Sequence, residues 1–311
     1  MNLYLTEEYG FATLKRGSYY DNPEAIYPTI GDFVMIDYNE SGDSRILETL
    51  KRISSFSRVD PSPDRSHEQL IAANFDYVFI MQSLNNNFNL HRLERYLTLG
   101  WQSGATPVIV LTKSDLVDNL DEYLELTKKI AMGAEIYPIS CVTKQGLEEL
   151  KKYFLPGKTV VFLGSSGVGK STLVNTLMGE EIMKTNEIRK EDSRGRHTTT
   201  NRQIIMLKNG TMIIDTPGMK ELGMWDVSEG LEIAFLDVEE YLGKCKFTDC
   251  THTNEPGCVI KKAIKNGELS EERYESYMKL KKEAKYNDDS ESYLKEKKEK
   301  FKKIAIMNRK K

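Results

Sequence analysis

The chain has 311 residues, of which 39% are hydrophobic and 29% are charged, and its formal net charge is −3. This length suffices for two or three domains with hydrophobic cores, and the apolar content excludes general disorder. No stretch approaches the ~18 consecutive apolar residues that cross a bilayer, and the N-terminal residues lack the pattern of a secretory signal. We therefore expect a cytoplasmic protein with no membrane segment.

Residues 1–67 hold short apolar runs, such as residues 33–36 and 46–47, between turn residues. Runs of this length that are separated by turns predict a small β-barrel. Residues 57–66 include two prolines among serines and charged residues, which predicts a linker. We place the first domain boundary after residue 67.

From residue 68 to residue 222, apolar runs typical of strands alternate with stretches typical of helices. The predicted strands are Tyr77–Met81, Val108–Leu111, Glu135–Ile139, Thr159–Leu163, Gln203–Leu207 and Met212–Ile214. The predicted helices cover residues 90–97, 121–131, 146–153 and 171–178. This alternation predicts an α/β domain with a mostly parallel sheet. Beyond residue 222 the strands cease, and charged helices are expected from about residue 269.

The segment from Gly164 to Ser171 has the pattern G-x-x-x-x-G-K-[ST], with a predicted strand before it and a predicted helix after it. Backbone N–H groups in such a loop point at phosphate oxygens, and the positive end of the following helix assists them. Lys170 would reach the β and γ phosphates, and Ser171 would bind Mg²⁺. The predicted phosphate-binding residues are Gly164, Ser165, Ser166, Gly167, Val168, Gly169, Lys170, Ser171 and Thr172.

The tetrapeptide Asp-Thr-Pro-Gly at residues 215–218 follows another predicted strand, where a sensor of the nucleotide state would lie. Asp215 would hold Mg²⁺ through water, and the N–H of Gly218 would contact the γ-phosphate. Alone, this tetrapeptide is also compatible with an ordinary turn. Together with the phosphate loop, it indicates a nucleotide site.

A base-reading motif, Thr112-Lys113-Ser114-Asp115, follows the predicted strand Val108–Leu111 and is a variant of N-K-x-D. The carboxylate of Asp115 can accept hydrogen bonds from N1–H and N2–H of guanine, and the stem of Lys113 can cover the ring. Thr112 lacks the second donor of an amide but keeps a hydroxyl that can tether neighbouring loops. The motif therefore predicts selectivity for guanine over adenine.

Two further features concern the arrangement of this site. Ser140 and Cys141 begin a Ser-Cys-Val-Thr run after a predicted strand, which resembles the next loop of a GTPase, with Cys141 as a packing residue rather than a nucleophile. In ordinary GTPases the phosphate loop precedes the base-reading motif, and here it follows. Ligands of parallel sheets collect at the carboxyl ends of the strands whatever the chain order. The reversed order therefore suggests a circular permutation with an intact site.

The C-terminal part carries a candidate metal site, Cys245, Cys250, His252 and Cys258, in the spacing C-x4-C-x-H-x5-C. Three thiolates and an imidazole suit tetrahedral Zn²⁺, and a full set of four protein ligands is typical of a structural site. Four unrelated residues in a loop are the alternative.

Residues 261–311 hold 17 basic and 10 acidic residues, which suits either nucleic-acid contact or a solvated helix face.

With its motifs in this order, and with Gly-Arg-His-Thr-Thr-Thr at residues 195–200, the chain resembles the ribosome small subunit-dependent GTPase A family. The resemblance implies an N-terminal OB-fold at residues 1–67, a circularly permuted GTPase domain at 68–222 and a zinc-binding, mainly helical domain at 223–311. It also implies GTP hydrolysis that is stimulated by the small ribosomal subunit, in late 30S maturation. The implied partners are GTP or GDP with Mg²⁺, the 30S subunit and its 16S rRNA, and the expected state is a monomer with one zinc ion.

The resemblance places the first switch at about residues 186–200, with Thr199 as the second Mg²⁺ ligand and Thr198 as the alternative. The residue after the Asp-Thr-Pro-Gly motif is Met219, where many GTPases carry a glutamine that orients water. We therefore interpret His197 as the catalytic residue, because an imidazole can orient the attacking water. A packing role for this histidine is the alternative.

Two other functions remain open from the sequence. One is a GTP-dependent RNA-binding checkpoint module in which hydrolysis is incidental. The other is a small-molecule kinase, which the two guanine-nucleotide motifs disfavour. The permuted order also suggests that the chain carries a nucleotide signal directly from residue 218 through residues 219–222 into the zinc domain.

Overall fold

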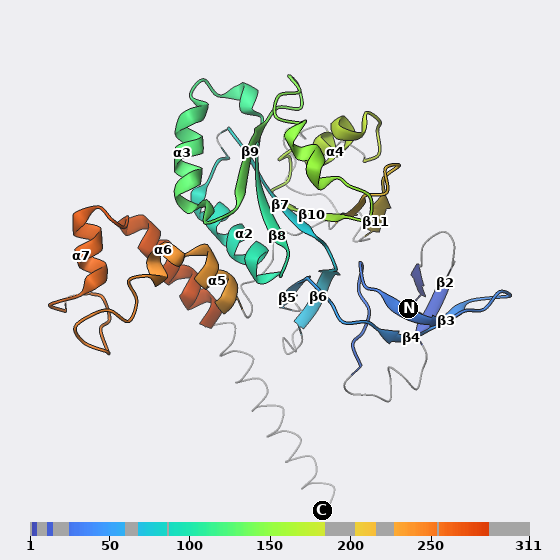
Figure 1. Cartoon of the computed structure of the whole chain (residues 1–311), viewed down its shortest axis with the longest axis horizontal. Helices are drawn as coiled ribbons and strands as arrows, with labels where there is room; N and C mark the ends of the chain where they lie inside the picture. Colours follow the sequence, from blue (N-terminus) through green and yellow to red (C-terminus); the bar gives the residue numbers. More distant parts are fainter. Residues whose placement is uncertain are drawn as a thin grey trace, which may run out of the picture.

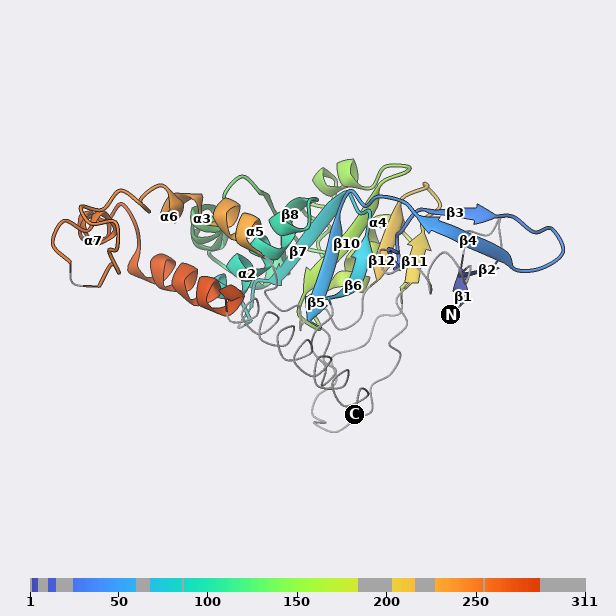
Figure 2. The same cartoon turned by 90° about the horizontal axis from the view of Figure 1, so that it is seen from below.

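The computed structural model describes residues 2–4, 11–14, 25–59, 68–85, 87–183, 203–215, 227–253 and 255–285. A central α/β layer lies between N-terminal strands on one side and C-terminal helices on the other (Figure 1). The second view shows the same arrangement (Figure 2). In these ranges, no helix combines the length and the apolar character needed to cross a bilayer.

The central layer is a six-stranded sheet with the order β11-β12-β10-β7-β8-β9. Its strands are β7 (Tyr77–Ser83), β8 (Thr106–Thr112), β9 (Glu135–Ile139), β10 (Thr159–Gly164), β11 (Gln203–Met206) and β12 (Met212–Asp215). Every neighbouring pair is parallel except β11 with β12. The six predicted strands and the mostly parallel sheet are therefore confirmed.

The two faces of this sheet are covered by different helices. Successive residues of a strand point to opposite faces, so Val78 and Ile80 of β7 join one apolar cluster while Phe79 and Met81 join the other. The first cluster includes α2 (Leu90–Gln102) and α3 (Leu120–Ala131), and the second includes α4 (Lys170–Met178). These helices match three of the predicted ones.

The fourth predicted helix, at residues 146–153, is wrong in its extent. Only Glu149–Tyr153 is helical, as the 3-10 segment η2. Gly146 has a φ of +72°, and a Cβ at this position would lie 2.3 Å from the carbonyl oxygen of Pro138. The chain turns sharply at this glycine, so a helix cannot begin there.

The N-terminal strands β1 (Asn2–Tyr4), β2 (Phe11–Leu14), β3 (Val34–Asp37) and β4 (Ser44–Thr49) form a separate sheet with the order β1-β2-β4-β3. Its apolar interior is small, with Ala12 and Ile46 fully buried and a few half-buried side chains around them. On the other face, β3 leaves Met35 exposed, and Phe33 beside it is exposed too. This sheet lies where the sequence predicts a small β-barrel, and among the described residues it has β1 and β3 at its edges.

The strands β5 (Ser55–Val59) and β6 (Glu68–Ala73) form an antiparallel pair. Residues 57–59 therefore belong to a strand and not to the predicted linker. The pair belongs to the core of the central layer, because Phe56 stacks on Phe75 with ring centroids 4.8 Å apart and packs with Ile71. The predicted boundary after residue 67 lies between these two paired strands.

The C-terminal module comprises the described residues from 227 to 285. Its helices are α5 (Ser228–Ala234), α6 (Leu236–Glu239), α7 (Val259–Asn266) and a last helical stretch at residues 271–285. It packs against α2 of the central layer, where the N–H of Gly230 donates to Oε1 of Gln102 at 2.7 Å. A Cβ at Gly230 would lie 2.3 Å from the carbonyl oxygen of Thr98, so α5 approaches α2 closely.

We expect Gly230→Ala to lower the free energy of unfolding by about 1–3 kcal/mol, because the added methyl group forces α5 away from α2. Thermal and urea denaturation of the full chain measure the change. Glu229→Ala, at the exposed neighbouring position of the same helix, is the control and should shift stability by less than about 0.5 kcal/mol. Equal stability of the two variants would contradict the close packing.

Candidate nucleotide and metal sites

The base-reading motif and the phosphate loop lie at the same edge of the central sheet. β7 separates β8 from β10, and its register pairs Ser83 with Thr112 on one side and Met81 with Gly164 on the other. All three strands are parallel, so both motifs follow the carboxyl ends of nearby strands. Their reversed order in the chain therefore does not separate them in space.

The two loops are joined by direct hydrogen bonds. The hydroxyl of Thr112 donates to the carbonyl oxygen of Val168 at 2.7 Å, and Nζ of Lys113 donates to the carbonyl oxygen of Gly167 at 3.1 Å. Thr112 is buried, and Lys113 has a left-handed backbone with a φ of +61°. The predicted tethering role of the Thr112 hydroxyl is confirmed, and its partner is the phosphate loop.

The phosphate loop has the backbone that its glycines predict. Gly167 and Gly169 have φ values of +74° and +103°, and the helix α4 begins at Lys170. A Cβ at Gly164 would lie 2.8 Å from the carbonyl oxygen of Met81, so the loop begins pressed against β7. The N-terminal end of α4 thus follows the loop directly, as an anion site requires.

Asp215 ends β12 and is half-buried near the phosphate loop. Burial raises the pKa of its carboxyl group, while the charge of Lys170 acts in the opposite direction. A buried carboxylate gains from a nearby cation, so this position suits a group that holds Mg²⁺ through water. The other predicted residues of the two switches, namely His197, Thr198, Thr199, Gly218 and Met219, lie outside the described residues.

The loop after β9 lies beside the base-reading motif. Ser140 is buried and its hydroxyl oxygen accepts from the N–H groups of Val142 at 3.2 Å and Thr143 at 3.1 Å. Burial raises the pKa of the Cys141 thiol, and the nearby charge of Asp115 raises it further. A protonated, half-buried thiol is a poor nucleophile, which agrees with the predicted packing role. Ser114 is buried, and its hydroxyl has no hydrogen-bond partner among the described residues.

The predicted metal ligands converge in the C-terminal module. The ligand atoms of Cys245, Cys250, His252 and Cys258 all lie within 4.8 Å of one another. Nδ1 of His252 is 3.4, 3.6 and 3.5 Å from the sulfur atoms of Cys245, Cys250 and Cys258, and the sulfurs of Cys245 and Cys258 are 4.0 Å apart. A tetrahedral zinc ion with ordinary bond lengths would separate nitrogen from sulfur by about 3.6 Å and sulfur from sulfur by about 3.8 Å.

The surroundings of these ligands also suit a metal. The backbone N–H of Val259 donates to the sulfur of Cys245 at 3.4 Å, and that of Lys261 donates to Cys258 at 3.5 Å. Cys258 is the N-cap of α7, so the positive end of the helix dipole faces its sulfur. These donors compensate the charge of metal-bound sulfur, so the residues fit the zinc site that their spacing predicts.

Comparison with known proteins identifies the family. The sequence model described as RsgA GTPase matches residues 49–225. A protein of Listeria monocytogenes named small ribosomal subunit biogenesis GTPase RsgA 2 is 48% identical over 284 residues, which cover 91% of this chain and 80% of that protein. The chain belongs to the RsgA GTPase family.

Other relatives agree with this family. The small ribosomal subunit biogenesis GTPase RsgA of Methanosarcina acetivorans is 46% identical over 254 residues, which cover 81% of this chain and 69% of that protein. The crystal structure of YjeQ from Thermotoga maritima superposes with a TM-score of 0.63 at 29% identity, covering 88% of this chain and 90% of that one. The structure of YloQ, a circularly permuted GTPase, has a TM-score of 0.56 at 24% identity, covering 90% and 88%. The permuted α/β fold expected from the motif order is therefore confirmed.

One part of this RsgA-family site was not predicted, namely the loop between β7 and α2. In this loop Nδ2 of Asn87 donates to the hydroxyl oxygen of Ser165 in the phosphate loop at 3.1 Å. The sequence does carry a signal, because three consecutive asparagines at residues 85–87 follow a predicted strand. Polar residues at a strand's carboxyl end are candidates for a ligand site, but they match no known motif.

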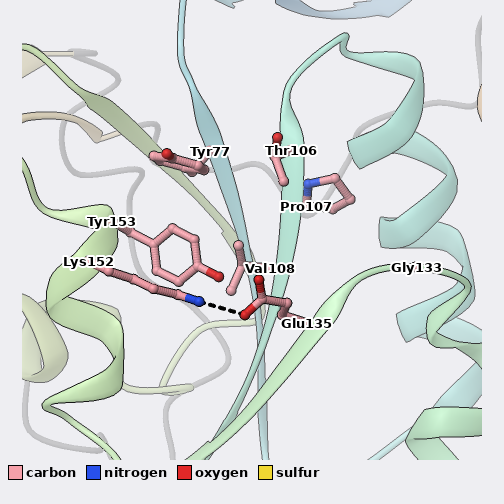
Figure 3. Close-up of a pocket in the computed structure, with 8 residues that line it drawn as sticks. All are labelled: Tyr77, Thr106, Pro107, Val108, Gly133, Glu135, Lys152 and Tyr153. Atoms are coloured by element: carbon pink, nitrogen blue, oxygen red, sulfur yellow. Dashed lines mark hydrogen bonds and ion pairs between the residues drawn. The ribbon is translucent and has the colours of Figure 1, made fainter.

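A cavity of about 310 Å³ lies at the opposite edge of the sheet, at the amino ends of β8 and β9 (Figure 3). Its lining includes Tyr77, Thr106 and Tyr153, and Lys152 forms an ion pair with Glu135 at 2.7 Å there. None of the predicted nucleotide-binding residues that the structure describes lines it. This cavity is therefore separate from the nucleotide site of the RsgA-family domain.

We expect Cys250→Ser to weaken zinc binding by more than about 100-fold, because loss of a direct ligand exceeds the ~10–100-fold effect of losing an outer-shell partner. Metal analysis of the purified chain and chelator competition measure the change. The control is Cys141→Ser, since the Cys141 sulfur lies outside the cluster and should leave zinc content unchanged. Equal zinc content in both variants would exclude Cys250 as a ligand.

We expect Asp115→Asn to lower GTP affinity by at least about tenfold, because two hydrogen bonds to a charged carboxylate contribute roughly 1.5–3 kcal/mol each. The same change should favour xanthosine triphosphate, whose oxygen at C2 can accept from the new amide. Fluorescent-nucleotide titration measures both affinities. Asp118→Asn removes an exposed carboxylate three residues away and should change neither affinity.

Proposed function

We propose that this chain hydrolyses GTP to GDP and phosphate under stimulation by the small ribosomal subunit, in late maturation of the 30S subunit. The observation that carries the proposal is the direct contact of the base-reading motif with the phosphate loop, through Thr112 and Lys113. These bonds hold side by side the two motifs that would recognise a guanine nucleotide. The relatives named above as small ribosomal subunit biogenesis GTPases support the choice of stimulating partner.

The nucleotide would lie along the carboxyl edge of the sheet. Lys113 and Asp115 bind guanine, with Thr112, Ser114, Ser140 and Cys141 shaping the base pocket, and residues 164–172 hold the phosphates. Ser171 and Thr199 bind Mg²⁺ directly, Asp215 holds it through water, and Gly218 contacts the γ-phosphate. Burial raises the pKa of the Asp215 carboxyl, and this supports a role beside Mg²⁺, because a bound cation would offset the cost of burying the charged carboxylate.

Hydrolysis by the isolated chain should be slow. Met219 stands where a glutamine would orient the water, and an apolar side chain cannot do so. His197 takes this role as the catalytic residue, and the chain reaches its full rate only on the ribosomal particle. The particle therefore acts as the activator.

The metal cluster binds one structural Zn²⁺ per chain. The distances from Nδ1 of His252 to the three sulfur atoms, and between the sulfurs of Cys245 and Cys258, are close to those of a tetrahedral zinc site. Four protein ligands leave no position for a substrate, so the ion stabilises the fold of the module. For a short segment of this kind, zinc contributes on the order of 10–16 kcal/mol to folding.

The N-terminal sheet and the zinc module are docking surfaces for the 30S subunit and its 16S rRNA. The N-terminal sheet exposes large apolar side chains, with Phe33 58% and Met35 50% accessible to solvent, and these two positions share a face by strand alternation. Exposed apolar and aromatic side chains that lie together are typical of interaction surfaces. The protein acts as a monomer in the cytoplasm, where its ribosomal partner is assembled.

We expect single-turnover GTP hydrolysis to rise at least about 100-fold with 30S subunits and to stay near the basal rate with 50S subunits or naked RNA, in line with known GTPase activators. His197→Ala should keep GTP affinity and lose most of the stimulated rate. His67→Ala is the matched control and should keep the stimulated rate, because His67 belongs to none of the predicted nucleotide-binding, switch or zinc-binding residues.

The outcomes separate the proposals. Unchanged stimulated turnover in His197→Ala would exclude the catalytic role of this histidine. A basal rate unaffected by 30S particles, with GTP-dependent binding to them, would favour a checkpoint module over a stimulated hydrolase.

A further inference from the structure

The loop between β7 and α2 contacts the base-reading motif, the phosphate loop and the start of α2. Its backbone reaches the base-reading motif, because the N–H of Leu84 donates to the carbonyl oxygen of Thr112 at 2.8 Å. Its end is fixed by Gln82, whose Nε2 donates to the carbonyl oxygen of Asn89, the N-cap of α2, at 2.8 Å. The loop is therefore held at both ends and has a defined path between them.

Asn87 makes the contact to the phosphate loop, and its orientation is determined by Arg92. The guanidinium group of Arg92 donates both to the backbone carbonyl oxygen of Asn87 and, at 3.0 Å, to its side-chain oxygen. A guanidinium has no acceptor, so the amide oxygen must face Arg92 and the amide nitrogen must face Ser165. Nδ2 accordingly lies 3.1 Å from the hydroxyl oxygen of Ser165. Arg92 belongs to the first turn of α2, so this helix positions Asn87.

The next residues of the same helix bind the C-terminal module. Glu94 accepts from Arg273 at 2.7 Å, and the two side chains are only 4% and 6% exposed. Glu94 also accepts from the hydroxyl of Ser276, and Arg273 donates to Asp237 at 2.9 Å. The two charges of this buried ion pair stay together, because separating them would leave each one buried without a partner.

The contact continues along α2. Arg95 forms a double hydrogen bond with Glu283, at 2.8 and 2.6 Å, and Gln102 at the far end accepts from Gly230. The module therefore touches the helix near both of its ends. A movement of the first turn of α2 cannot occur without a change in these contacts or a distortion of the helix.

We propose that Asn87 is a positioning residue of the phosphate loop, and that α2 thereby couples nucleotide binding to the docking of the zinc module. The stretch from Asn87 to Glu94 contacts Ser165 at one end and Arg273 at the other. A nucleotide that orders the phosphate loop stabilises the Asn87 contact, the first turn of α2 and the ion pair together. By thermodynamic linkage, a docked module strengthens nucleotide binding by the same factor.

This route differs from the covalent one suggested by the motif order, because it runs through side chains at residues 87–95 and not through residues 219–222. It rests on the proposed function in one respect, namely that the phosphate loop binds a guanine nucleotide. It requires neither hydrolysis nor a ribosomal partner.

The first test is a mutational cycle of GDP affinity on the full zinc-bound chain. Asn87→Ala and Ser165→Ala should each raise the Kd for GDP about two- to tenfold, the range expected for one hydrogen bond, and the double variant should be no weaker than the weaker single variant. The control is Asn266→Ala, an exposed asparagine of α7 with one side-chain hydrogen bond, which should leave the Kd unchanged. Additive effects of the two substitutions would refute the contact.

The second test measures hydrogen exchange of the C-terminal helix, at residues 271–285, with and without saturating GDP. In the unchanged chain GDP should slow this exchange about fivefold or more, within the usual range of coupling between sites. In Asn87→Ala saturated with GDP, exchange should slow at residues 164–178 and remain fast at residues 271–285. A merely local role of Asn87 would not produce this difference.

Each outcome is decisive. If GDP still slows hydrogen exchange at residues 271–285 in Asn87→Ala, the inference is overturned and the proposed function stands. The same conclusion follows if the unchanged chain binds GDP but exchange in that helix does not slow. A chain that binds no guanine nucleotide overturns the proposed function, and this inference with it.

Discussion

The nucleotide site depends on one contact, between the base-reading motif and the phosphate loop at the carboxyl edge of the central sheet. Thr112 and Lys113 donate to consecutive carbonyl groups, of Val168 and Gly167, across the gap between two strand ends. The bonds are non-covalent and the strands are parallel, so it does not matter which loop comes first along the chain. A permuted chain can therefore build the same guanine-nucleotide site as an ordinary GTPase.

The helix α2 is the second element on which the architecture depends. One of its faces packs on the sheet through Leu93 and Leu97, and its polar residues bind the C-terminal module. That module contributes buried side chains to the same apolar cluster, including Phe235 and Tyr277. The metal ligands gather at the far part of the module, where the segment from residue 245 to residue 258 is short and mostly exposed. A metal ion held there would substitute for the hydrophobic core that such a segment cannot form.

The sequence predicted correctly the elements that depend on local patterns, and it failed where an element depends on contacts distant in the chain. Strands such as β8 and β10 were predicted because parallel strands buried on both faces are continuous apolar runs. The extent of η2 and the strand residues 57–59 were not predicted. The conformation of Gly146 results from its contact with Pro138, and β5 is stabilised by pairing with β6 across residues 60–67. Contacts that are distant in the chain leave little trace in local composition.

The residue types and their local spacing were sufficient to identify the family of this protein and to predict the chemistry of its sites. A glycine-rich loop before a helix, a lysine and an aspartate after a strand, and three cysteines with a histidine have few other uses, because phosphate, guanine and zinc each demand particular donor groups. Only the tertiary structure could bring Asn87 to Ser165, 78 residues away, or Glu94 to Arg273, 179 residues away. Those contacts depend on strand order and helix packing, which the whole chain determines together and no short segment encodes.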